Sequence, residues 1–79
     1  MTPEQRGVIV AALNHYGATL TDDDRIARGE KVLSVRLDVR KGRLRMLSPT
    51  GEPLASYPAS RLASGVADFV EGFWYWKPV

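Results

Sequence analysis

The sequence predicts an α+β domain in which an N-terminal helix, a three-stranded antiparallel β-meander and a C-terminal helix form one compact unit over residues 1–79. The C-terminal helix is expected to pack on one face of the sheet. Three observations carry this prediction: a capped apolar stripe opens the chain, apolar and polar residues alternate from Val32, and a second apolar stripe begins at Leu62. A chain of 79 residues is too short for two cores, so these elements share one.

The first element is a helix from Thr2 to about Tyr16. Thr2 suits the N-cap, Pro3 the first helical position, and Gln5 the third position of a capping box. Gly17 suits the left-handed residue that follows a helix. The stripe expected to be buried repeats at helical spacing and comprises Ile9, Ala12, Leu13 and Tyr16.

Residues 21–29 leave two interpretations open. Thr21 before three acidic residues, with Arg28 and Gly29 at the end, is typical of a short capped helix, and the same residues also suit an acidic loop. The run Asp22 to Asp24 lacks the alternating ligands and the fixed glycine of a calcium loop. We therefore interpret it as the start of a helix rather than as a metal site.

Residues 32–48 predict a β-hairpin with a two-residue turn at Lys41 and Gly42. This turn pairs residue 40 with 43, 39 with 44, 38 with 45 and 37 with 46. Alternate residues of a strand share one face, so the first strand has an apolar face that comprises Leu33, Val35, Leu37 and Val39.

The rest of the chain predicts a turn at residues 49–52, a short third strand from Leu54 to Tyr57, and a helix after Pro58. Gly65 lies inside this helix, where a close approach of the helix to the sheet would explain it. The apolar face of the helix comprises Leu62, Val66, Phe69, Val70 and Phe73.

Composition limits the function classes. The chain has no cysteine and one histidine, which excludes disulfides and a Cys/His zinc site. Its first residues do not form a secretion signal, and its longest apolar run, Val8 to Leu13, is too short to span a membrane. We therefore expect a cytoplasmic protein.

Charge is concentrated in the hairpin. The net charge is only +2, but residues 32–48 contain five basic side chains and one acidic side chain. The predicted register gathers most of them on the face opposite the apolar set, where arginine heads would suit carboxylates or phosphates. An ordinary charged, solvated strand face is the alternative. Because Arg40 and Arg43 would stand directly opposite each other, we predict a partner-binding face made of Arg36, Arg40, Lys41, Arg43 and Arg45.

Four aromatic residues, from Phe73 to Trp76, follow each other near the end of the chain. One helix face cannot bury all four, so some are expected at the surface, where tryptophan often anchors interfaces. Trp74 and Trp76 are the predicted partner-binding members. The alternative is that Phe73 and one tryptophan close the core.

No catalytic or cofactor motif is found. The chain has no glycine-rich phosphate loop, no nucleophile elbow and no spaced set of metal ligands. His15 has no cysteine, serine or second histidine beside it, and is expected to be a surface or capping residue. We expect a protein that binds a partner without catalysis and without a cofactor.

The capped N-terminal helix, the Val32 to Ser48 hairpin and the aromatic C-terminal end resemble, in size and layout, the anti-CRISPR proteins of phages and mobile elements. The resemblance extends over all 79 residues but rests on no motif, so it transfers no functional residue. It implies an inhibitor that acts in the cytoplasm of a bacterial host, docks on a CRISPR effector complex and blocks target DNA binding or nuclease recruitment. The alternative is a nucleic-acid-binding or regulatory protein that lays its basic hairpin against phosphates. With either partner, we expect the chain to act as a monomer or a homodimer.

Overall fold

The computed structural model describes residues 1–79 and begins with helix α1, Pro3–Asn14. The predicted capping box is present: Gln5 N donates to Thr2 Oγ1 over 3.1 Å, and Thr2 N donates to Gln5 Oε1 over 2.9 Å. Ile9, Ala12, Leu13 and Tyr16 are all buried, as the helical spacing predicted. Gly17 has a φ of 70° and reverses the chain after the helix.

The segment after α1 forms a β-hairpin, so the interpretation of residues 21–29 as a helix is wrong. Strand β1, Ala18–Leu20, pairs antiparallel with strand β2, Arg25–Arg28. The Thr21 hydroxyl accepts from Arg25 N over 3.1 Å, so this residue caps a turn rather than a helix. Asp24 has a φ of 64°, in the left-handed region, which a helix does not allow.

The predicted hairpin is confirmed with its register. Strand β3, Lys31–Arg40, pairs with strand β4, Arg43–Leu47, and the pairs include Leu37 with Met46 and Val39 with Leu44. Lys41 and Gly42 have φ values of 53° and 73°, the combination that a tight two-residue hairpin turn requires. Strand β5, Pro53–Pro58, follows and pairs with β4.

The sheet therefore has five strands rather than three, in the order β1-β2-β3-β4-β5. Every strand is antiparallel to its neighbour and next to it in the sequence. The three strands predicted from the sequence, β3 to β5, form one part of this sheet, and β1 and β2 extend it. The α+β class and the meander are confirmed.

A short 3₁₀ turn, η1 (Ala59–Arg61), leads into helix α2, Leu62–Phe73. The predicted apolar face is buried from Leu62 to Val70, but Phe73 is 50% exposed because the helix ends there. Gly65 lies against the sheet: a Cβ at this position would stand 3.0 Å from Tyr57 Cβ on β5. The predicted close approach of helix and sheet is thus confirmed.

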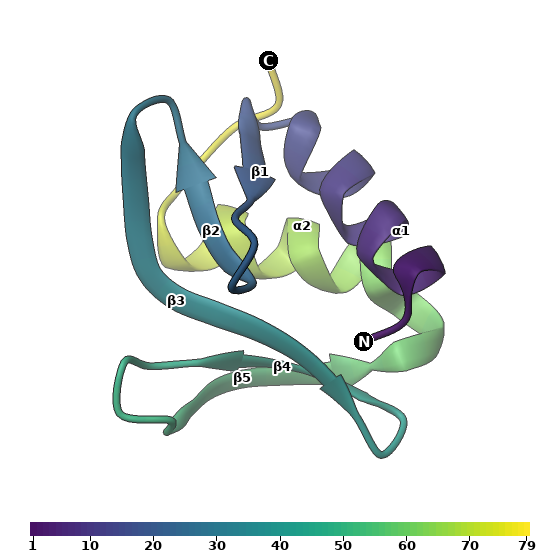
Figure 1. Ribbon diagram of the computed structural model, residues 1–79. Coiled ribbons are helices and arrows are strands. Elements are labelled where there is room, and N and C mark those ends of the chain that lie inside the picture. The colour runs from purple at the N-terminus through teal and green to yellow at the C-terminus, as the bar shows by residue number, and fades with distance from the viewer.

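The sheet is strongly bent, and both helices lie on its concave side (Figure 1). α1 packs on β1 and α2, and α2 packs on β5. The core between these layers is apolar and contains no buried charged residue; its largest fully buried side chains are Ile9, Leu13, Ile26, Leu37, Leu44, Met46, Val66 and Val70. Neither helix has the length and apolar character that crossing a bilayer demands.

Candidate functional site

The outer face of the sheet, turned away from the helices, carries the predicted basic residues. Side chains alternate along a strand, so the burial of Leu37 and Leu44 directs Asp38, Arg40, Arg43 and Arg45 to this outer face. The register pairs Arg40 with Arg43 and Asp38 with Arg45. The end of the β3–β4 hairpin therefore presents a dense group of cations.

The three arginines, together with Lys41 in the hairpin turn, surround a hollow of about 370 Å³. We call it the basic hollow; it is lined by Arg40, Lys41, Arg43 and Arg45 and by no other residue. Several arginine forks and one lysine around a shallow space suit an anion with more than one oxygen, such as a carboxylate or a phosphate.

Two members of the basic hollow are held in place by neighbouring strands. Arg45 donates to both carboxylate oxygens of Asp38, over 2.9 Å from Nε and 2.6 Å from Nη2. This hydrogen-bonded pair holds the pKa of Asp38 below its usual range, so the carboxylate stays ionised. Arg43 Nε donates to Ser56 Oγ on β5 over 2.9 Å.

The other two members, Arg40 and Lys41, have no ion pair within the chain. Both are exposed, and Arg40 stands directly opposite Arg43. Like charges directly opposite each other across a sheet lower its stability. Asp38 is the one carboxylate paired with the group, so the hollow keeps a net positive charge.

Arg36 does not join this group. It pairs with Leu47 on one side and with Arg25 on the other, further along β3. There it lines a separate, smaller hollow of about 160 Å³ together with three carboxylates, those of Asp23, Asp24 and Asp38. The structure thus divides the predicted arginine face into a basic end and a mixed-charge end.

The acidic run Asp22 to Asp24 serves the turn between β1 and β2. Asp23 accepts a hydrogen bond from the Thr21 hydroxyl, which holds the pKa of Asp23 below its usual range. Its Oδ2 lies 3.6 Å from Arg25 Nε. The Asp24 carboxylate accepts from the Arg6 guanidinium, and its backbone oxygen accepts from Leu37 N over 2.9 Å. These contacts tie the turn to α1 and to β3.

The two predicted tryptophans are half-buried. Trp74 and Trp76 stack on each other with ring centres 4.8 Å apart, and both pack against the core. The Arg28 guanidinium lies 4.5 Å from the centre of the Trp76 ring, a cation–π contact. The exposed aromatics of this segment are instead Phe73, at 50%, and Tyr75, at 83%.

Two parts of the surface were missed by the sequence analysis. The first is the hydrogen bond from Arg43 to Ser56, which could have been expected because the third predicted strand implied the pairing of β4 with β5. The second is the contact of Arg28 with Trp76, which no local sequence pattern indicates, because it depends on strand β2 and on the path of the chain after α2.

Comparison of the chain with protein-family models, with curated proteins and with solved structures gives no match. The basic hollow is therefore the feature from which we infer a function.

Proposed function

We propose that this protein is a non-catalytic binding protein that docks the basic hollow on an acidic surface of a protein partner. The observation that carries the proposal is the placement of Arg40, Lys41 and Arg43 at one hairpin end, where none of the three forms an ion pair with a carboxylate of the chain. Such a group lowers the stability of the fold, and an anionic partner offsets that cost on binding.

The resemblance to anti-CRISPR proteins gives the proposal its specific form. In that form the partner is a CRISPR effector complex, and docking blocks target DNA binding or nuclease recruitment. A chain of net charge +2 does not suit imitation of DNA, so inhibition runs through contact of the basic hollow with acidic side chains of the effector.

Nucleic acid is the second candidate, since the same forks suit phosphates. After Asp38 is subtracted from the four cations, the basic hollow carries a net charge of three. Three phosphate contacts would give a slope of about −3 for log affinity against log salt, so that binding near physiological salt would be weak. For a single copy, the number of charges therefore favours a protein partner over nucleic acid.

The test measures binding of purified CRISPR effector complex, and separately of labelled duplex and single-stranded DNA, at low and physiological salt. The variant Arg40→Ser/Arg43→Ser should lose at least tenfold in affinity for the effector, because two cations at the centre of the contact are removed. Lys31→Ser/Lys77→Ser is the matched control, since it removes two exposed cations that lie at the start of β3 and after α2, away from the basic hollow.

Equal loss in both variants would point to net charge rather than to the basic hollow. Steeply salt-dependent binding of DNA with no binding of the effector would favour the nucleic-acid candidate. No binding of either partner would contradict the proposed function.

A further inference from the structure

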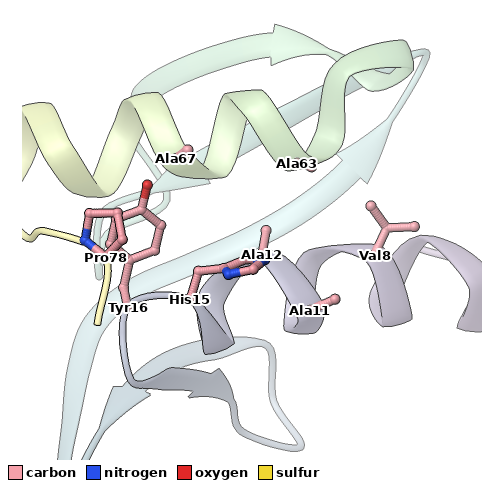
Figure 2. Close-up of a pocket in the computed structure, with 8 residues that line it drawn as sticks. All are labelled: Val8, Ala11, Ala12, His15, Tyr16, Ala63, Ala67 and Pro78. Atoms are coloured by element: carbon pink, nitrogen blue, oxygen red, sulfur yellow. The ribbon is translucent and has the colours of Figure 1, made fainter.

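The face of the molecule opposite the basic hollow carries an apolar groove between α1 and α2. Figure 2 shows the groove with its residues on the two helices and at the chain end. We call it the helix groove; its volume is about 390 Å³, and it is lined by Val8, Ala11, Ala12, His15, Tyr16, Ala63, Ala67 and Pro78. Four alanines make it shallow and let another backbone approach closely.

Val8 extends this surface toward the start of both helices. It is 45% exposed and also lines a second hollow with the residues from Ala59 to Ser64. The second hollow also contains Ser60, Arg61 and Ser64, so the surface is apolar in the helix groove and mixed at the start of α2. A partner that covers both Val8 and the helix groove would remove their apolar surface from water, which is favourable.

The two helices run in the same direction, since the residue numbers of both increase toward the end where Tyr16 and Pro78 lie (Figure 2). Arg61 lies at the beginning of α2 and Glu71 near its end, ten residues apart and about 15 Å along the axis. Neither has an ion pair within the chain; Glu71 accepts a hydrogen bond from the Tyr16 hydroxyl.

This charge pattern is self-complementary. Consider a two-fold axis that lies in the plane between two copies, perpendicular to the helices and level with the middle of the groove. It places the two grooves face to face and exchanges the two ends of the helices. Arg61 of one copy then meets Glu71 of the other, twice in the same dimer, and Val8 lies over the end formed by Tyr16 and Pro78. An unrelated partner would have to supply both charges itself.

We propose that the occupant of the helix groove is a second copy of this chain, packed with its helices antiparallel to those of the first. Each copy covers the exposed valine and the alanines of the other. The basic hollow lies on the outer face of the sheet, so a dimer presents two such hollows on its outside. This inference does not depend on the proposed function.

Sedimentation velocity between about 1 μM and about 1 mM, the range in which a weak dimer dissociates, measures the association directly. The parent chain should pass from monomer to dimer within this range. Ala63→Glu places a charge on an exposed helical position inside the groove and should leave a monomer. Glu52→Arg, in the exposed turn between β4 and β5, is the control and should dimerise like the parent.

A charge exchange tests the orientation. Arg61→Glu alone and Glu71→Arg alone should each weaken the dimer by about tenfold, because both rim pairs become repulsive. The double variant Arg61→Glu/Glu71→Arg should restore the parent constant. Glu71→Arg also removes the acceptor of the Tyr16 hydroxyl, so melting temperatures are recorded, and Arg61→Glu, which leaves that bond intact, repeats the test independently.

A parent chain that stays monomeric at about 1 mM would overturn the proposal. A dimer that survives Ala63→Glu would place the interface elsewhere, and a double variant as weak as the single variants would exclude the antiparallel arrangement. Variants of Arg40 and Arg43 should leave association unchanged, which separates this result from that of the binding test above.

Discussion

Asp38 on β3 and Arg45 on β4 face each other across the outer surface of the sheet and share two hydrogen bonds, of 2.9 and 2.6 Å. This pair ties Arg45 down beside Arg40 and lowers the charge of the basic hollow by one. The same carboxylate thus orders the hollow and weakens its attraction for anions. The variant Asp38→Asn separates the two roles, because it removes the negative charge but keeps a side-chain oxygen that can accept a hydrogen bond from Arg45.

Asp38→Asn should bind an anionic partner more tightly than the parent and should be less sensitive to acid. The pKa of Asp38 is lowered in the folded state, so the pair stabilises the fold above the ordinary aspartate pKa of about 4 and ceases to do so as pH falls through the lower, folded value. Urea unfolding at several pH values measures this. The stability difference from the parent should be small at neutral pH, about 0.5 kcal/mol for a partly exposed pair, and should vanish in acid.

Lys41→Asn should raise stability while lowering affinity. Lys41 adopts a φ of 53°, a conformation that asparagine accepts at lower cost, so the variant should gain about 0.5 kcal/mol, or about 2–4 °C in melting temperature. It also removes one cation from the basic hollow. Lys41→Gln removes the same cation without helping the turn, and it should show the loss of affinity alone. Equal melting temperatures for the two variants would contradict the role of the turn.

Replacing either of two glycines by alanine should change the stability of the fold, in opposite directions. Gly7 in α1 has open space where a Cβ would lie, so Gly7→Ala should stabilise the protein by about 1 kcal/mol through helix propensity. Gly65→Ala would place its Cβ 3.0 Å from Tyr57 Cβ, an atom fixed to the strand backbone, and should destabilise by about 1 kcal/mol despite the same propensity gain. Thermal unfolding of both variants measures the difference; a stabilised Gly65→Ala would mean that α2 can move away from β5.

Tyr16→Phe should make the protein less sensitive to alkali. The hydrogen bond to Glu71, together with burial and the negative charge of that carboxylate, raises the pKa of Tyr16 to about 12. The protonated phenol therefore stabilises the fold fully below pH 10, and this contribution, about 2–3 kcal/mol, is lost between about pH 10 and 12. Burial also raises the pKa of Tyr57, so part of the alkaline loss should remain. Identical alkaline unfolding of variant and parent would contradict the assignment.

The β3–β4 hairpin could be predicted from the sequence because two independent signals agree there. The Lys41-Gly42 turn fixes the register, and the alternation from Leu33 to Val39 fixes which face is buried. The group formed by Arg40, Arg43 and Arg45 follows from that register alone.

Strands β1 and β2 could not be predicted in the same way. With three and four residues they are too short to show alternation, and Thr21 before three aspartates imitates a helix cap. The neighbours of Arg36 depend on this missed turn, so its separation from the basic hollow was missed as well. The tryptophans are half-buried because the chain turns back after α2 and Val79 N donates to His15 O over 2.8 Å, a long-range contact without a local pattern.

The edge strand β5 begins with Pro53 and ends with Pro58. Proline has no backbone N–H, so a strand from another molecule would find this edge short of hydrogen-bond donors at both ends. The opposite edge, β1, offers only three residues. Growth of the sheet from molecule to molecule, the first step toward fibrils, is therefore disfavoured at both margins. We expect concentrated solutions to show no time-dependent rise in thioflavin fluorescence, even though the chain is rich in short antiparallel strands.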